Sequence, residues 1–187
     1  MSSPSIRRTL LIRCGIGTGI LASVLSVSIY LMVRHSLYAE LDESLRGTAS
    51  ILANQMEYEH GEIIFEWQEG IGANPSLDDA SLFQYSDEKS GFVTRSPALR
   101  TDDLPKFTGP GGTPDIETIV IPGRLEHARA IGMLIHPYIM PEENAAMKAV
   151  GLRFDAKAFP HTLVVARDLT PILRTLAELA AILCIGT

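Results

Sequence analysis

The stretch from Cys14 to Val33, CGIGTGILASVLSVSIYLMV, decides the architecture of this chain. Its twenty residues carry no charge. A helix rises about 1.5 Å per residue, so this run would cover the roughly 30 Å hydrocarbon core of a bilayer in one pass. A helix buried in a globular domain is usually shorter and keeps a polar stripe. The sequence therefore predicts a membrane-spanning helix over residues 14–33.

The residues around this run bear on how the helix is inserted. Three arginines precede it within residues 1–13, as they would in a secretory signal peptide. Signal peptides have shorter apolar regions, of about 7 to 15 residues, and residues 36–39 make a poor cleavage site, so an uncleaved anchor is favoured. Short basic flanks stay in the cytoplasm, which predicts a cytoplasmic segment 1–13 and an exported domain 34–173.

Length and composition restrict the remaining possibilities. The 187 residues leave room for one ordinary domain besides a membrane segment. Residues 36–173 hold 21 acidic side chains against 11 Lys and Arg, a net charge of −10 that makes nucleic acid an unexpected partner. Both cysteines, Cys14 and Cys184, lie in apolar segments, so the exported domain must be held together by packing without an internal disulfide.

An amphipathic helix is predicted directly after the span. Apolar residues recur there mostly at four-residue steps, with charged residues between them: Leu37, Leu41, Leu45, Leu52 and Met56. The helix is expected to continue from the membrane, with its apolar stripe covering a sheet, packing against a second copy, or both.

Beyond residue 61 the pattern changes to short runs of branched and aromatic residues, which predict strands. The expected strands are residues 62–67, 81–86, 92–95, 116–121, 128–135 and 161–167, with 152–154 as a less regular addition. Turns after residues 86 and 121 predict two antiparallel pairs. The proline-rich segment 96–116 is expected to be a surface loop, and PEENAAMKA (141–149) a short helix. The fold class is therefore α+β with a small antiparallel sheet.

A last helix is predicted to follow Asp168, an acid of the type that caps helix N-termini. After Glu178 come nine apolar or small residues, too few to cross a bilayer. Either the helix is amphipathic and packs on the domain, or residues 174–187 begin a second span that is truncated. The uncharged ending favours the truncated span.

Few residues suggest chemistry. Gly15 and Gly19, four apart, are candidates for close packing of two membrane helices, and their segment lacks the strand-to-helix context of a nucleotide-binding loop. The five histidines show no metal-ligand spacing, and no nucleophile elbow or His-Glu-x-x-His motif occurs. The paired carboxylates lie in loops or at a helix start. No catalytic, metal-binding or cofactor-binding residue is predicted.

Two arginines are candidates for ligand binding. Arg95 and Arg129 each interrupt an otherwise apolar or alternating strand, and a guanidinium can hold a carboxylate or phosphate with two hydrogen bonds. Pairing with a local acidic residue is the favoured interpretation, with a bound ligand anion as the alternative.

The order of these parts resembles a known family. The relevant stretches are LDESLRGTASILA (41–53), FQYSDEKSGFVTRSPAL (83–99) followed by DLP (103–105), GRLEHARAIG (123–132) and LVVARDLTPILRTL (163–176). Together with the anchor they resemble the N-terminal input region of bacterial sensor histidine kinases of two-component systems. The resemblance implies a PAS-like or Cache-like periplasmic domain between two spans of the inner membrane, working as a homodimer that detects a periplasmic signal.

The sequence departs from that family after the last helix. It holds no HAMP linker, phospho-accepting histidine box or ATP site, so the chain alone is expected to be inactive. ATP, Mg²⁺ and a cognate response regulator would belong to the missing kinase part. The rival hypotheses are a complete single-span protein whose periplasmic domain binds a partner, and the input region of another receptor, such as a chemoreceptor or a cyclic-nucleotide enzyme. The sequence does not identify the signal.

Overall fold

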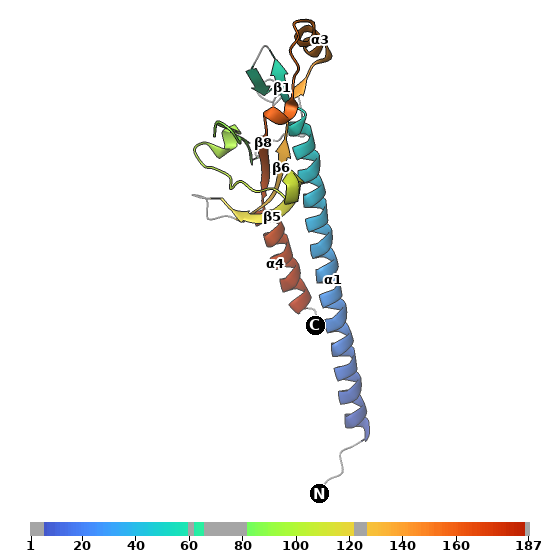
Figure 1. Cartoon of the computed structure of the whole chain (residues 1–187). Helices are drawn as coiled ribbons and strands as arrows, with labels where there is room; N and C mark the ends of the chain where they lie inside the picture. The colour runs from blue at the N-terminus through green and yellow to red at the C-terminus, as the bar shows by residue number, and fades with distance from the viewer. Residues whose placement is uncertain (1–5, 60–61, 66–81, 122–126, 186–187) are drawn as a thin grey trace. The chain divides into compact units, whose positions relative to one another are not determined.

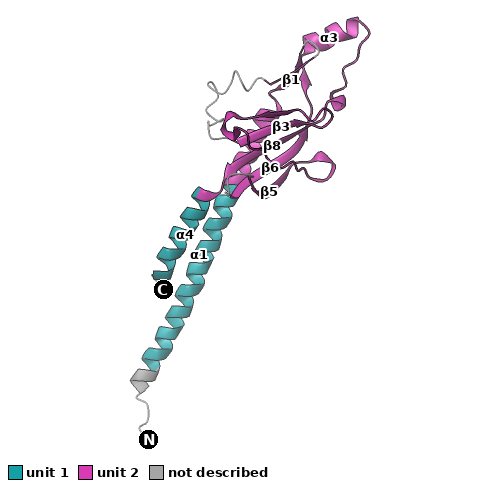
Figure 2. Cartoon of the chain, turned by 90° about the vertical axis from the view of Figure 1, so that its left-hand side faces the viewer, with its two compact units in different colours: residues 1–40, 171–187 teal, residues 41–170 magenta. Residues whose placement is uncertain are grey.

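The chain has an α+β fold with one long apolar N-terminal helix and small sheets. A computed structural model describes it in four ranges: residues 6–59, 62–65, 82–121 and 127–185. The structure divides into two compact units, one of residues 1–40 with 171–187 and the other of residues 41–170 (Figure 2). The second unit contains both sheets and the last turns of the first helix.

Helix α1 (Ile6–Ala53) includes the whole uncharged run. Among the described residues it is the one helix that is long and apolar enough to cross a membrane, and none of its most apolar window is buried. By length and composition it is a candidate membrane span. The predicted continuation of the helix beyond the span is confirmed as far as Ala53.

Hydroxyl groups within the uncharged run are bonded to the helix itself. Thr18, Ser23 and Ser28 each donate to the backbone carbonyl four residues earlier, at 2.8 to 2.9 Å. In hydrocarbon an unpaired hydroxyl would be costly, so such local bonds let these residues face lipid.

The predicted apolar stripe extends one residue too far. Leu45 and Leu52 are fully buried, but α1 ends at Ala53, and Met56 begins strand β1 (Met56–Glu59). Met56 is also fully buried, so it belongs to the same core although it lies on a strand. A turn at residues 54–55 preserves the four-residue step, which is why periodicity did not reveal the change of element.

Five antiparallel strands form the main sheet, in the order β4-β3-β8-β6-β5. Their bounds are β3 (Leu82–Asp87), β4 (Val93–Arg95), β5 (Asp115–Val120), β6 (His127–Ile135) and β8 (His161–Asp168). The two predicted antiparallel pairs and the predicted strand at 161–167 are confirmed. Six consecutive residues of β8 are buried, so both faces of the sheet are covered at its centre.

The end of α1 covers one face of this sheet, which we call the helix face (Figure 1). The segment 96–109 covers the other, the loop face. There Leu99 and Leu104 are buried with Val164 of β8, so the expectation of a surface loop is wrong for these residues. The backbone of this segment passes so close to β6 that a Cβ on Gly132 would lie 2.1 Å from the Phe107 carbonyl oxygen.

A smaller sheet has the order β2-β1-β7. Strand β2 (Glu62–Phe65) is antiparallel to β1, while β7 (Tyr138–Ile139) is parallel to it. The predicted strand at 62–67 is confirmed through Phe65, and its last two residues lie outside the described ranges. Strands β1 and β7 were not predicted, because two to four residues are too few to show a period.

Helix α3 (Pro141–Ala149) has the predicted bounds. The strand expected at residues 152–154 is absent, so that prediction is wrong. The segment follows Gly151, whose φ of 78° ends the helix, and Phe154 packs its ring 4.6 Å from that of Tyr58. Aromatic packing, without strand pairing, therefore explains its apolar residues.

Helix α4 (Thr170–Ile185) begins two residues after β8. The Asp168 carboxylate accepts hydrogen bonds from the Thr170 backbone N–H at 2.8 Å and from its hydroxyl at 2.7 Å. The predicted capping role of Asp168 is thus confirmed. Toward the end of α4, Ile182 and Ile185 are 68% and 87% exposed.

Candidate functional site

A charged pair joins the end of α1 to the helix face of the main sheet. The Arg129 guanidinium, on β6, donates from Nε to Oδ1 of Asp42 at 2.8 Å and from Nη2 to Oδ2 at 3.0 Å. Its Nη1 also donates to the Thr118 hydroxyl at 3.3 Å. The Arg129 and Asp42 side chains are 21% and 19% exposed. This two-bond geometry fixes the rotation of α1 against the sheet more strictly than a single contact would.

The pair is electrostatically favourable in this setting. The hydrogen bonds and positive charge of Arg129 lower the pKa of Asp42 below its ordinary value, outweighing the opposing effect of burial, and Arg46 contributes further. A lowered carboxyl pKa means that the folded protein favours the ionised form. Asp42 is therefore an ionised partner of Arg129 at neutral pH.

A second tie holds the C-terminal end of α1. The Tyr85 hydroxyl, on β3, donates to the Leu52 carbonyl oxygen at 2.9 Å. The same carbonyl also accepts from the Gln55 backbone N–H at 3.1 Å, so Tyr85 adds a second bond at this helix end. Burial raises the pKa of Tyr85, which keeps the hydroxyl a donor. Phe65 packs its ring 4.7 Å from that of Tyr85. Together we call Asp42, Leu52, Tyr85 and Arg129 the helix–sheet junction.

Strand β8 lies between the two strands that supply the junction. Tyr85 is directly opposite Leu163 in the β3–β8 register, and Arg129 is opposite Arg167 in the β6–β8 register. The same strand then leads into α4 through the Asp168 cap. A displacement of β8 would therefore act on both ties to α1 and on the start of α4.

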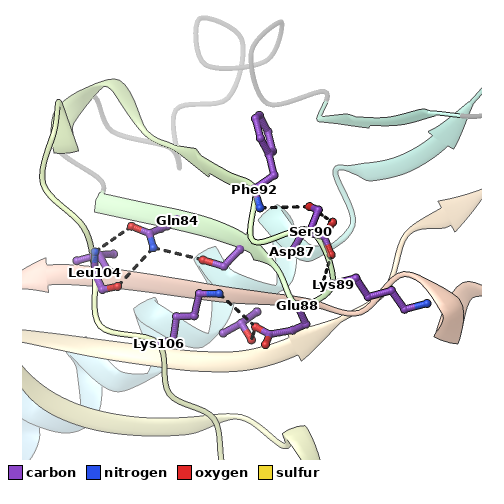
Figure 3. A network of polar contacts seen from close by, with 10 residues as sticks. Gln84, Asp87, Glu88, Lys89, Ser90, Phe92, Leu104 and Lys106 are labelled. Carbon is purple, nitrogen blue, oxygen red and sulfur yellow. Dashed lines mark hydrogen bonds and ion pairs between the residues drawn. The ribbon is translucent and has the colours of Figure 1, made fainter.

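On the loop face, a buried glutamine fixes the covering segment. Gln84 Oε1 accepts from the Leu104 backbone N–H at 2.9 Å (Figure 3). Gln84 Nε2 donates to the Leu104 carbonyl oxygen at 3.4 Å and to the Ser86 hydroxyl oxygen at 3.3 Å. Nearby, Glu88 accepts from the Thr162 hydroxyl at 2.6 Å and lies 3.7 Å from Lys106 Nζ. These contacts are internal to the fold and hold the segment on the sheet.

Arg95 and Arg129 are not brought together. Arg95, opposite Gln84 in the β3–β4 register, belongs to the loop face, where its Nη2 donates to Asp103 Oδ1 at 2.6 Å. These side chains are 32% and 61% exposed, so their pair is the more solvated one. Each arginine thus binds a carboxylate of its own chain, the favoured interpretation above, and a ligand anion would have to displace that aspartate.

Gly15 and Gly19 lie in the uncharged run of α1. A Cβ built on either glycine meets no described atom within 4 Å, so their surface is open to another helix. Elsewhere in the same unit a groove of about 260 Å³ is lined by residues of α1 and α4: Ser23, Ser26, Val27, Tyr30, Ala180, Leu183 and Cys184. The predicted packing role of the glycines stays a prediction.

Metal-binding chemistry finds little support in the described part of the chain. No group of three or more His, Cys, Asp or Glu side chains is close enough there to hold an ion. His161 is buried, with Nδ1 3.2 Å from the Phe159 carbonyl oxygen and its ring 6.3 Å from that of Phe65. These contacts are ordinary for a core histidine.

Comparison with known proteins provides no relative: no family model, curated protein or solved structure matches the chain. The resemblance to sensor histidine kinases therefore rests on the sequence motifs alone. What the chain does has to be argued from its own geometry.

Sequence reasoning identified only one residue of the helix–sheet junction. Arg129 is a candidate from the sequence, but its partner Asp42 lies 87 positions away. In the sequence Asp42 is only one of the charged residues between the leucines of the predicted apolar stripe. Tyr85 carried a usable signal, since a tyrosine on the apolar face of a strand needs a partner for its hydroxyl. Nothing local in the sequence identifies that partner as the carbonyl of Leu52.

Proposed function

We propose that this chain is the signal-sensing, membrane-anchored input region of a receptor of the bacterial sensor-histidine-kinase type. In this proposal α1 crosses the inner membrane and residues 41–170 lie in the periplasm. The support is the order of the sequence motifs and the apolar composition of α1. The given residues hold no kinase motif, so ATP, Mg²⁺ and a response regulator enter only through a kinase region elsewhere in the receptor.

The observation that carries the proposal is the position of β8. It is the middle strand of the main sheet, it lies directly between the two strands tied to α1, and only Leu169 separates it from α4. Packed interiors transmit strain and do not absorb it. A ligand that shifts the sheet would therefore change the position or rotation of both helices, which is what a sensor needs in order to signal through a membrane.

Two finer features belong to the same proposal. A PAS-like identity is supported by the antiparallel order, in which the first and last strands of the main sheet, β3 and β8, are neighbours, with β4 outside β3 and the β5–β6 pair outside β8. A membrane location for the end of α4 is supported by its uncharged sequence after Glu178 and by the exposure of Ile182 and Ile185. A homodimer is supported by the open surface at Gly15 and Gly19.

Coupling through α1 is tested at Ala39, an exposed helix position between the uncharged run and Asp42. Ala39→Pro breaks the helix before its first tie to the sheet without removing a buried side chain, and Ala39→Ser is its matched control. Each is combined with Leu163→Ala, which leaves a cavity beside the junction. In membranes from cells that express the whole receptor, the cavity should alter autophosphorylation in the Ala39→Ser background only.

An equal response to the cavity in both backgrounds would contradict coupling through α1. The kinase assignment is tested separately by sequencing the gene beyond codon 187. A coding region there for a phospho-accepting histidine box and an ATP site is expected, and a stop codon or an unrelated domain in place of these would overturn that assignment.

Orientation is tested by cysteine labelling. With Cys14 and Cys184 replaced by Ser, Lys89→Cys places a single thiol at an exposed turn of the main sheet, and Ser2→Cys places one near the N-terminus. In intact cells a membrane-impermeant maleimide should label the first and not the second. Labelling of the second alone would reverse the proposed topology.

A further inference from the structure

Four side chains at the end of the uncharged run line a hollow of about 340 Å³ on α1: Leu31, Arg34, His35 and Tyr38. Their spacing of three and four residues places them on one side of the helix. All four belong to the first compact unit, so the hollow lies within one part of the molecule. Arg34 is the first charged residue after the run, so the hollow lies where the hydrocarbon of a membrane would end.

The Arg34 guanidinium is held by an aromatic ring and keeps its hydrogen-bond donors. Its Cζ lies above the Tyr38 ring, 5.9 Å from the ring centroid. Such a contact fixes a planar guanidinium and leaves its N–H groups available at the edge. Arg95 and Arg129 each bind a carboxylate of the chain, whereas no carboxylate in the described ranges pairs with Arg34. Arg34 can therefore bind an anion from outside the chain with two hydrogen bonds.

The surroundings of the hollow favour an anion. The chain holds no Asp or Glu before Glu40, although residues 36–173 carry a net charge of −10. His35 adds an imidazole N–H donor in either protonation state. A zwitterionic lipid would bring an ammonium group for which this stretch offers no carboxylate. A lipid with a net negative charge is therefore complemented better.

We propose that Arg34 and His35 bind the headgroup phosphate of an anionic phospholipid at the periplasmic boundary of the membrane, with Tyr38 positioning the guanidinium. Leu31 supplies an apolar wall next to the phosphate, and acyl chains could follow the uncharged run beyond it. A soluble phosphate would gain nothing from that apolar surface, so a lipid is favoured. The site rests on the proposed membrane span of α1 but not on the kinase assignment.

The test places the full chain in nanodiscs of defined composition, with 3-fluorotyrosine at its five tyrosines. The ¹⁹F signal of Tyr38 is assigned through Tyr38→Phe. Stepwise replacement of palmitoyl-oleoyl phosphatidylcholine by the matched phosphatidylglycerol should shift this signal in a saturable way and leave that of the buried Tyr85 unchanged. Inorganic phosphate added to discs of phosphatidylcholine should cause no shift, which separates a lipid headgroup from a free anion.

Variants then separate a built site from general surface charge. Arg34→Gln combined with His35→Gln should raise the half-saturating fraction of phosphatidylglycerol about fivefold, the factor expected for one basic residue near an anionic surface. Arg34→Lys keeps the charge without the planar fork and should also raise it. Arg46→Gln, further along α1 where Arg46 pairs with Glu43, is the matched control and should leave it unchanged.

The outcomes distinguish the site from the span on which it rests. Absence of a phosphatidylglycerol response at Tyr38, an equal response to inorganic phosphate, or an Arg34→Lys response equal to that of the native chain would each overturn the headgroup site alone. A native chain that fails to enter discs of phosphatidylcholine would instead contradict the membrane span, and the headgroup site with it.

Discussion

The centre of the main sheet and helix α3 belong to the same compact unit but differ in how they are held. Strand β8 has six consecutive buried residues, neighbours on both sides and a cover on both faces, whereas α3 has no buried residue and borders an open groove. The difference indicates a division of labour. The sheet and its junction with α1 provide stability and mechanical continuity, while α3 contributes little buried surface to the unit.

The largest effect is expected from a cavity in the sheet. Leu163 is fully buried on β8. Leu163→Ala should lower the free energy of unfolding by about 3 kcal/mol, the range being about 2 to 5 for such substitutions. Val150→Ala, next to α3 and 73% exposed, should change it by less than about 0.5 kcal/mol. Urea unfolding of the full chain in micelles, followed by near-ultraviolet circular dichroism, measures both, and similar values would remove the distinction between the regions.

The next effect concerns the charged pair of the junction. Asp42→Asn and Arg129→Gln should each cost about 2 kcal/mol, because each removes the charge-assisted hydrogen bonds between two mostly buried side chains. The double variant should cost less than the sum, with a coupling energy of about 1 to 3 kcal/mol. The solvated pair Arg95–Asp103 is the control, and Asp103→Asn should cost less than about 1 kcal/mol. Additive effects at the junction would show that the pair is not coupled.

The same pair predicts a pH dependence. Asp42 has a lower pKa in the folded chain than its ordinary value of 3.8, so its contribution is fully present above that value and is lost as the pH falls through the lowered pKa. The difference in stability between the native chain and Asp42→Asn should be constant from about pH 8 to pH 5 and shrink below about pH 4. Asp87, whose pKa is also lowered, is present in both chains, so its contribution to the pH dependence cancels in the difference. A difference that does not change with pH would mean that Asp42 acts through packing.

The contrast between these regions also explains which features the sequence could predict. Branched and apolar residues along 115–120, 127–135 and 161–168 are typical of strands, and PEENAAMKA carries its own helix-start signals, so these elements were predicted closely. The burial of Leu104 and the Asp42–Arg129 pair depend on segments far apart in the chain, which no local pattern encodes. The groove beside α3 depends on β1, a strand too short to recognise.

A smaller effect is expected at the other tie of the junction. Tyr85→Phe removes the hydroxyl that binds the Leu52 carbonyl and keeps the ring that packs on Phe65. Loss of one neutral hydrogen bond should cost about 1 kcal/mol, because the carbonyl keeps its bond from the Gln55 backbone N–H. Hydrogen exchange should show faster opening of the last turn of α1. Unchanged exchange there would indicate that Tyr85 contributes only its ring.

The smallest effect on global stability should come from breaking α3. Ala145→Pro removes a backbone donor in the middle of the helix and clashes with the preceding turn, so α3 itself should unfold. Because no residue of α3 is buried, urea unfolding of the sheet should change by less than about 0.5 kcal/mol. The helical signal in far-ultraviolet circular dichroism should nevertheless fall, because the nine residues of α3 no longer form a helix. A loss of more than about 2 kcal/mol would instead place α3 within the cooperative core, since changes to exposed surface rarely cost so much.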